Sequence, residues 1–135
     1  MFMKIMAAID GGDTSMKALT EATRMAASRH ATLRIVYAAS NSDEASQKTG
    51  LKLLAQAKSA VGDGVAVETR VIQADAVYGL TGIAEAIANA ANEWDADLVV
   101  VGTSNRRGLE RLVIGSVAEQ LIAKVDASVL LVRPH

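Results

Sequence analysis

The sequence predicts an α/β fold, a parallel sheet of five strands with helices on both faces. Short runs rich in β-branched residues or leucine alternate with longer stretches of helical periodicity, in the order βαβαβαβαβ. The fourth run, Leu98 to Val101, is apolar without alternation, which is typical of a parallel strand buried on both sides. At 135 residues the chain has the length of one domain, so we expect a single domain over residues 1–135.

The expected strands are the short apolar runs, and parallel strands require helical crossovers that return the chain to the same edge of the sheet. The strands are Lys4 to Ile9, Leu33 to Ala38, Val65 to Ile72, Leu98 to Val101 and Ser128 to Val132. The last of these carries the apolar sequence VLLV with no charge inside it. An exposed strand edge of this kind favours pairing with another chain, so we expect a homodimer through Ser128 to Val132.

Helical spacing of apolar residues marks the four connecting segments. Their apolar stripes are Met16, Leu19, Ala22 and Ala26; Leu54, Ala57 and Val61; Ile83, Ile87, Ala90 and Trp94; and Val117, Leu121 and Val125. The second helix is the least marked, because SDEASQKTG is polar and Gly50 falls within the segment, whereas GDG at 62–64 predicts a firm stop. Trp94 continues the third stripe at the amino end of a strand, which favours packing over base stacking.

Composition excludes several classes of function. The chain has no cysteine, so disulfides, thiolate metal sites and thiol nucleophiles are ruled out. A net charge of -1 gives no overall field for nucleic acid or an anionic membrane, and no apolar run is long enough to span a bilayer. The sequence has no Walker motif and no Gly-x-Gly-x-x-Gly after a strand. We expect a cytoplasmic protein with no nucleic-acid or membrane partner and no nucleophilic or metal-based catalysis.

The carboxyl ends of the strands are where an open α/β sheet binds ligands, at the point where strand order reverses. Asp10 follows the first strand and has two interpretations. An Asp before Gly-Gly is ordinary turn chemistry. Alternatively, Asp13 and Thr14 form the N-cap of the first helix, which frees Asp10 to accept hydrogen bonds from a ligand's hydroxyl or amino groups.

The stretch VVVGTSNRRGLERLVIGS, residues 99–116, is the second candidate for ligand binding. Ser116 and Glu119 form a capping box for the fourth helix, and Gly115 lets a ligand approach the unpaired N–H groups at that helix start. Capping and anion binding use the same donors, so both can hold. Three arginines lie in the loop between Gly102 and Gly115: Arg106, Arg107 and Arg111. They either form a solvated surface or favour the binding of an anion.

Three stretches together resemble the universal stress protein family: AAIDGGDTSMKAL, ADLVVVGTSNRRGLERLVIGSVAEQLI and ASVLLVRP. The resemblance covers nearly the whole chain and implies a Rossmann-like parallel sheet of order 3-2-1-4-5. ATP-binding members carry a Gly-x2-Gly-x9-Gly-Ser/Thr loop after the fourth strand. Gly102, Gly115 and Ser116 match this pattern, and Asn105 replaces its second glycine. Asn is the residue besides glycine that best tolerates a left-handed backbone.

The resemblance implies a regulatory, ATP-binding protein with Mg²⁺ and at most slow ATP hydrolysis. Asp10 would hold the ribose or adenine end, in a pocket lined by Ala8, Ile9 and Ala38. The loop from Gly102 to Ser116 would wrap the triphosphate, and phosphate would reach the N–H groups of Ser116 and Val117, with Asn105 and Arg106 at its border.

Three other functions stay open at this stage. The first is a dimeric interaction module of the same fold without nucleotide, acting on a signalling partner that the sequence does not name. The second is a flavodoxin-like electron carrier, which the low aromatic content disfavours. The third is a phospho-accepting receiver domain, for which Asp75 is loosely placed and Arg133 and Pro134 stand in place of a lysine. His30 and His135 lie at a helix end and at the last position, which disfavours a catalytic histidine.

Overall fold

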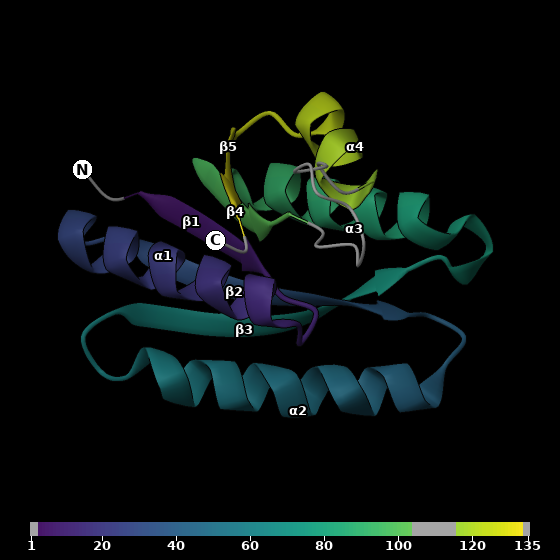
Figure 1. The fold of residues 1–135 in the computed structure, drawn as a ribbon, viewed down its shortest axis with the longest axis horizontal. Coiled ribbons are helices and arrows are strands. Elements are labelled where there is room, and N and C mark those ends of the chain that lie inside the picture. The colour runs from purple at the N-terminus through teal and green to yellow at the C-terminus, as the bar shows by residue number, and fades with distance from the viewer. Residues whose placement is uncertain (1–2, 104–115, 134–135) are drawn as a thin grey trace.

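The computed structural model describes residues 3–103 and 116–133, and its strands form one parallel sheet in the order β3-β2-β1-β4-β5 (Figure 1). The strands are β1 at Lys4–Ala8, β2 at Thr32–Ser40, β3 at Ala66–Ala74, β4 at Leu98–Gly102 and β5 at Ser128–Val132. The predicted fold class and strand order are therefore confirmed. All strands are parallel, but the strand order progresses toward one edge from β1 to β3 and toward the other edge from β4 to β5. The point between β1 and β4 is therefore the switch point at which such sheets bind ligands.

Helices cover both faces of the sheet, two on each (Figure 1). They are α1 at Asp13–Arg29, α2 at Glu44–Val61, α3 at Gly79–Trp94 and α4 at Ser116–Lys124, and a short 3-10 helix, η1 at Ala76–Tyr78, precedes α3. Alternate residues of β1 point to opposite faces, so Ile5 packs with α1 and α2 while Met6 packs with α3 and α4. All of Leu98 to Val101 is buried, which confirms the prediction from its unbroken apolar run.

The start of α1 corrects one expectation. Gly12, not Asp13 or Thr14, occupies the N-cap, and no side chain caps this helix. The Gly12 carbonyl accepts the first helical bond from Met16 N at 3.2 Å, so the helix begins one residue earlier than its polar side chains suggest. Asp13 and Thr14 consequently lie in the first helical turn.

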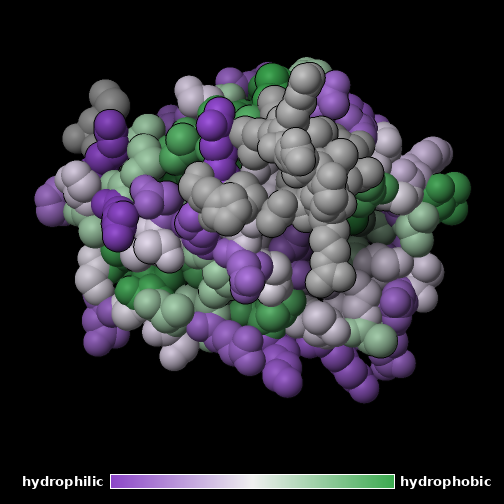
Figure 2. Space-filling model, viewed as in Figure 1, coloured by the Kyte–Doolittle hydropathy of each residue, from purple (hydrophilic) through white to green (hydrophobic). Residues whose placement is uncertain are grey.

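The second helix is continuous, although its sequence is polar and contains a glycine. The Asp43 side chain caps it by accepting a hydrogen bond from Ala45 N at 2.9 Å, and Gly62 ends it with φ 79°. Gly50 is required by packing, because a Cβ there would lie 2.5 Å from Cδ1 of the Tyr37 ring. Figure 2 shows polar side chains along the lower edge of the molecule, where the outer face of α2 lies.

Trp94 lies at the amino end of the sheet. The Arg34 guanidinium carbon is 4.3 Å from the centre of the Trp94 ring, and Lys4 Nζ donates to the Trp94 carbonyl at 3.0 Å. Arg34 is also paired with Glu68 on the neighbouring strand. The expectation that Trp94 serves packing is confirmed, since the ring contacts the core under α3 and α4 and lies at the end opposite the switch point. In the described part of the chain, no helix combines the length and apolarity that membrane crossing requires.

Candidate functional site

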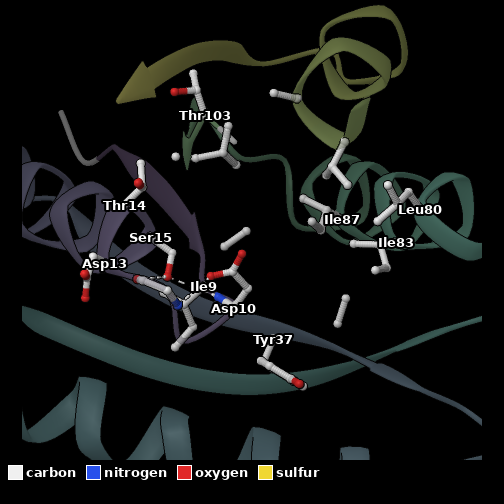
Figure 3. Close-up of a pocket in the computed structure, with 17 residues that line it drawn as sticks. Ile9, Asp10, Asp13, Thr14, Ser15, Tyr37, Leu80, Ile83, Ile87 and Thr103 are labelled. Atoms are coloured by element: carbon white, nitrogen blue, oxygen red, sulfur yellow. Dashed lines mark hydrogen bonds between the residues drawn. The ribbon is translucent and has the colours of Figure 1, made fainter. Parts of the chain in front are cut away.

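A cavity of about 550 Å³ opens at the carboxyl edge of the sheet, at the switch point between β1 and β4 (Figure 3). Strand ends form one side of it, the first turn of α1 another, and α3 and the start of α4 the rest. The sequence-predicted site residues that line it are Ala8, Ile9, Asp10, Ala38, Gly102 and Val117. Asn105, Arg106 and Gly115 lie outside the described residues, as does the side chain of Ser116.

Asp10 takes part in the turn after β1 through one of its two carboxylate oxygens. Its Oδ1 accepts the Gly12 N–H at 2.8 Å, and its own N–H donates to Ser15 Oγ at 3.2 Å. Ser15 Oγ in turn donates to the Gly12 carbonyl at 3.0 Å. Asp10 Oδ2 has no partner among the described residues, and Figure 3 shows the carboxyl group between α1 and α3. The turn role therefore holds, and it leaves one acceptor for a ligand.

The edge of β2 offers a pair of backbone groups to the cavity. β1 ends at Ala8, whereas β2 continues to Ser40. The Ile9 N–H donates to the Val36 carbonyl at 3.0 Å, so Val36 directs its backbone groups toward β1. Alternate residues of a strand face the same neighbour, so Ala38 directs its N–H and C=O to that side, beyond the end of β1. No loop backbone group of the described residues pairs with them.

Gly102 is the last residue of β4 and pairs with Val132 of β5. A Cβ on Gly102 would lie 2.9 Å from the Thr14 carbonyl oxygen, a backbone atom of α1. The glycine therefore lets the first turn of α1 approach β4, in addition to any freedom it gives the following loop. Both residues of this contact, Thr14 and Gly102, line the cavity.

Several cavity residues were missed by sequence reasoning. Thr14 and Thr103 bring hydroxyl groups to the end of the cavity near Gly102, and Thr103 is buried with its Oγ1 3.4 Å from the Val132 carbonyl (Figure 3). On α3 the apolar wall consists of Leu80, Ile83 and Ile87. Their spacing of three and four residues was visible in the sequence, but the same pattern also predicts a core face.

Strand order and comparison with known proteins settle the family. The order 3-2-1-4-5 differs from the 2-1-3-4-5 order of flavodoxins and receiver domains, which removes both alternatives. Residues 1–133 match the Universal stress protein family. The chain belongs to this family. The resemblance drawn from the glycine loop and the first strand is thus confirmed at family level.

Relatives of this universal stress protein match it over nearly its full length. Universal stress protein YxiE of Bacillus subtilis is 30% identical over 154 residues, which cover 98% of this chain and 100% of the relative. The structure of a universal stress protein from Archaeoglobus fulgidus superposes with a TM-score of 0.82 at 22% identity, over 98% of this chain and 99% of that one. A universal stress protein solved in complex with cAMP has a TM-score of 0.74 and 25% identity, over 96% of each chain.

Proposed function

We propose that this universal stress protein binds an adenine nucleotide in the cavity at the switch point, and that the ligand is ATP carried with Mg²⁺. The observation that carries the proposal is the N–H and C=O of Ala38, which face the cavity side by side and have no backbone partner among the described residues. Adenine presents an acceptor, N1, next to an amino donor, N6, and this pair is complementary to one strand residue. The related protein solved with cAMP supports the same ligand class.

The remaining parts of a nucleotide have counterparts along the cavity. Asp10 Oδ2, which has no partner in the described part of the chain, can accept hydrogen bonds from ribose hydroxyls, a task that carboxylates perform in other α/β nucleotide sites. Beyond it, the start of α4 provides backbone N–H groups at Ser116 and Val117, and the helix dipole favours phosphate there. A Mg²⁺ ion would arrive on the phosphates. Its chemistry is to neutralise charge on the β and γ groups.

The phosphate contacts of Asn105, Arg106 and Gly115 stay predictions of the sequence, as do a cytoplasmic location and a homodimer through β5. We propose a regulatory role with at most slow ATP hydrolysis.

Calorimetric titration with Mg-ATP tests the proposal through a matched pair of proline variants. Ala38→Pro removes the N–H that faces the cavity, whereas Ala39→Pro removes an N–H that faces β3 in the ladder. We expect Ala38→Pro to stay folded and to lose at least about tenfold in affinity, about 1.4 kcal/mol. Ala39→Pro should instead lower the free energy of unfolding.

Gly115→Val tests the phosphate end in the same titration, because the added side chain blocks approach to the N–H groups at the start of α4. A loss of about tenfold or more is expected. Unchanged affinity in both Ala38→Pro and Gly115→Val would overturn the site. Absence of nucleotide binding by the wild-type protein would favour the dimeric interaction module instead.

A further inference from the structure

Leu80 combines two properties that no other described residue shares. Five large apolar side chains are exposed in the described part of the chain, and Leu80 alone among them lines the cavity. The other four are Leu51, Val77, Tyr78 and Ile122. Leu80 is 48% exposed, on the first turn of α3. A leucine left half in water at the mouth of a cavity gains burial when a ligand fills that cavity.

Leu80 belongs to an apolar wall on α3 whose residues become more exposed to solvent from the core toward the mouth of the cavity. Ile87 is buried, Ile83 is half-buried and Leu80 is exposed, and all three face the cavity from one side of α3 (Figure 3). Ala38, whose side chain is a single methyl group, lines the same cavity and packs, like Ile83, against the core cluster under α3 and α4. We call the part of the cavity lined by these apolar side chains, beside the backbone pair of Ala38, the slot. Leu80 is the outermost residue of the slot.

Leu80 is held in place by tight packing beneath it. A Cβ on Gly82 would clash with the carbonyl oxygen of Asp75 at the end of β3. The same carbonyl accepts the Tyr78 N–H at 3.2 Å, and the Asp75 side chain accepts the Val77 N–H at 3.0 Å. Figure 2 shows an apolar projection at the right edge of the molecule, over this turn. The first turn of α3 therefore packs closely against the residue that follows β3, and Leu80 lies on this turn beside the cavity.

We infer that Leu80 is a specificity-determining residue that closes the base end of the nucleotide site and limits the size of substituents on the adenine. The inference rests on the proposed nucleotide function. Ala38 contacts the edge of the base that carries the amino group, and Leu80 covers the base where it emerges from the slot. Unsubstituted adenine fits beneath the leucine, whereas a bulky group on N6 collides with it.

The test compares Leu80→Ala with Val77→Ala, since Val77 is 85% exposed in the neighbouring helix η1 and does not line the cavity. Calorimetry measures the binding of AMP, ATP and N6-benzyl-AMP. Leu80→Ala should weaken AMP and ATP by the same factor, about three- to tenfold, because the side chain acts away from the phosphates. It should also raise the affinity for N6-benzyl-AMP relative to AMP by at least about tenfold. Val77→Ala should match the wild type with all three ligands.

Two results would overturn the inference, and they are distinct from each other. Tight AMP binding by the wild type with an unchanged ratio of N6-benzyl-AMP to AMP in Leu80→Ala removes the role of Leu80 and leaves the nucleotide site intact. Failure of the wild type to bind AMP and ATP removes the proposed function and this inference with it. Circular dichroism on both variants checks that each is folded, and a second variant, Leu80→Val, should give an intermediate ratio.

Discussion

Asp10 Oδ1 accepts the Gly12 N–H at 2.8 Å, and this bond ties the cavity carboxylate to the start of α1. The bond leaves Oδ2 as the oxygen available to a ligand. In the proposed nucleotide site, the same side chain would hold the turn through Oδ1 and bind the ligand through Oδ2. The two tasks can be separated by substitution.

Asp10→Asn should retain the turn and impair binding. The amide oxygen can still accept the Gly12 N–H, while the charged acceptor facing the ligand is replaced by a neutral amide. We expect thermal unfolding close to wild type and Mg-ATP affinity reduced about three- to tenfold by calorimetry. Asp10→Ala should lose the turn bond too and destabilise the protein by about 1 kcal/mol. With 2′,3′-dideoxy-ATP, wild type and Asp10→Asn should bind alike; a persisting difference would show that Asp10 does not contact the ribose.

Gly50→Ala should destabilise the protein although alanine is the better helix former. Inside a helix alanine is favoured over glycine by about 1 kcal/mol. At this position the new Cβ would lie 2.5 Å from the Tyr37 ring, and overpacking of this kind costs about 1 to 3 kcal/mol. Urea unfolding should therefore show a net loss, relieved when Tyr37→Val is added. Gly64→Ala is the control, because a Cβ there meets nothing within 4 Å. Equal stability of Gly50→Ala and wild type would contradict the packing argument.

Sequence patterns predicted the features that depend on local periodicity. The unbroken apolar run at Leu98 to Val101 required burial on both sides, and the structure has it so. Gly50 could not be explained in this way, because its reason is the ring of Tyr37 on a strand that is distant in sequence. The helix start at Gly12 was displaced for a similar reason. Asp13 and Thr14, the polar residues that follow Gly12, were expected to cap α1. Instead Gly12 is the N-cap, and its N–H donates to Asp10 Oδ1 in the preceding turn.

The candidate site was predicted only in part. Residues at strand ends were identified, whereas cavity residues on α3 were not. Asp10 and Gly102 were found because strand ends at a switch point follow from topology, whereas Ala38 was indicated by the family resemblance. Ile83 and Ile87 were placed in the apolar stripe of the third helix, and Leu80 was not singled out, since a helical stripe has the same spacing whether it faces a sheet or a cavity. Whether a residue of the stripe faces the sheet or the cavity depends on how far the strands extend opposite the helix.

Trp94 fluorescence should not respond to nucleotide. The ring packs against Arg34 at the amino end of the sheet, and the cavity lies at the carboxyl end. Saturating Mg-ATP should leave the emission maximum and intensity of this single tryptophan unchanged, while calorimetry on the same sample reports binding. Arg34→Ala should change the emission without nucleotide, which confirms that the probe is sensitive to its surroundings. Strong quenching by ATP would contradict the position assigned to the site.

The open edge of β5 allows a sharp test of the predicted homodimer. Ser128 N–H donates to the Asp97 carbonyl and the Val132 carbonyl accepts from Thr103, so these two β5 residues bond to β4. Alternation along the strand then directs the backbone of Leu130 to β4 and that of Leu131 to the open edge. In the described sheet β5 has β4 as its one neighbour, and the edge beyond Leu131 is available for a second chain.

Proline at these two neighbouring positions should therefore give opposite results. Leu131→Pro removes an N–H that faces the partner, a position proline tolerates in edge strands, and should yield a folded monomer. Leu130→Pro removes a bond to β4 and should lower stability instead by about 1 kcal/mol or more. Light scattering at micromolar concentration gives the mass, and thermal unfolding gives the stability. The notion of pairing through this edge fails if the wild type is monomeric, or if Leu131→Pro remains a dimer with native stability, since the second chain would then dock elsewhere.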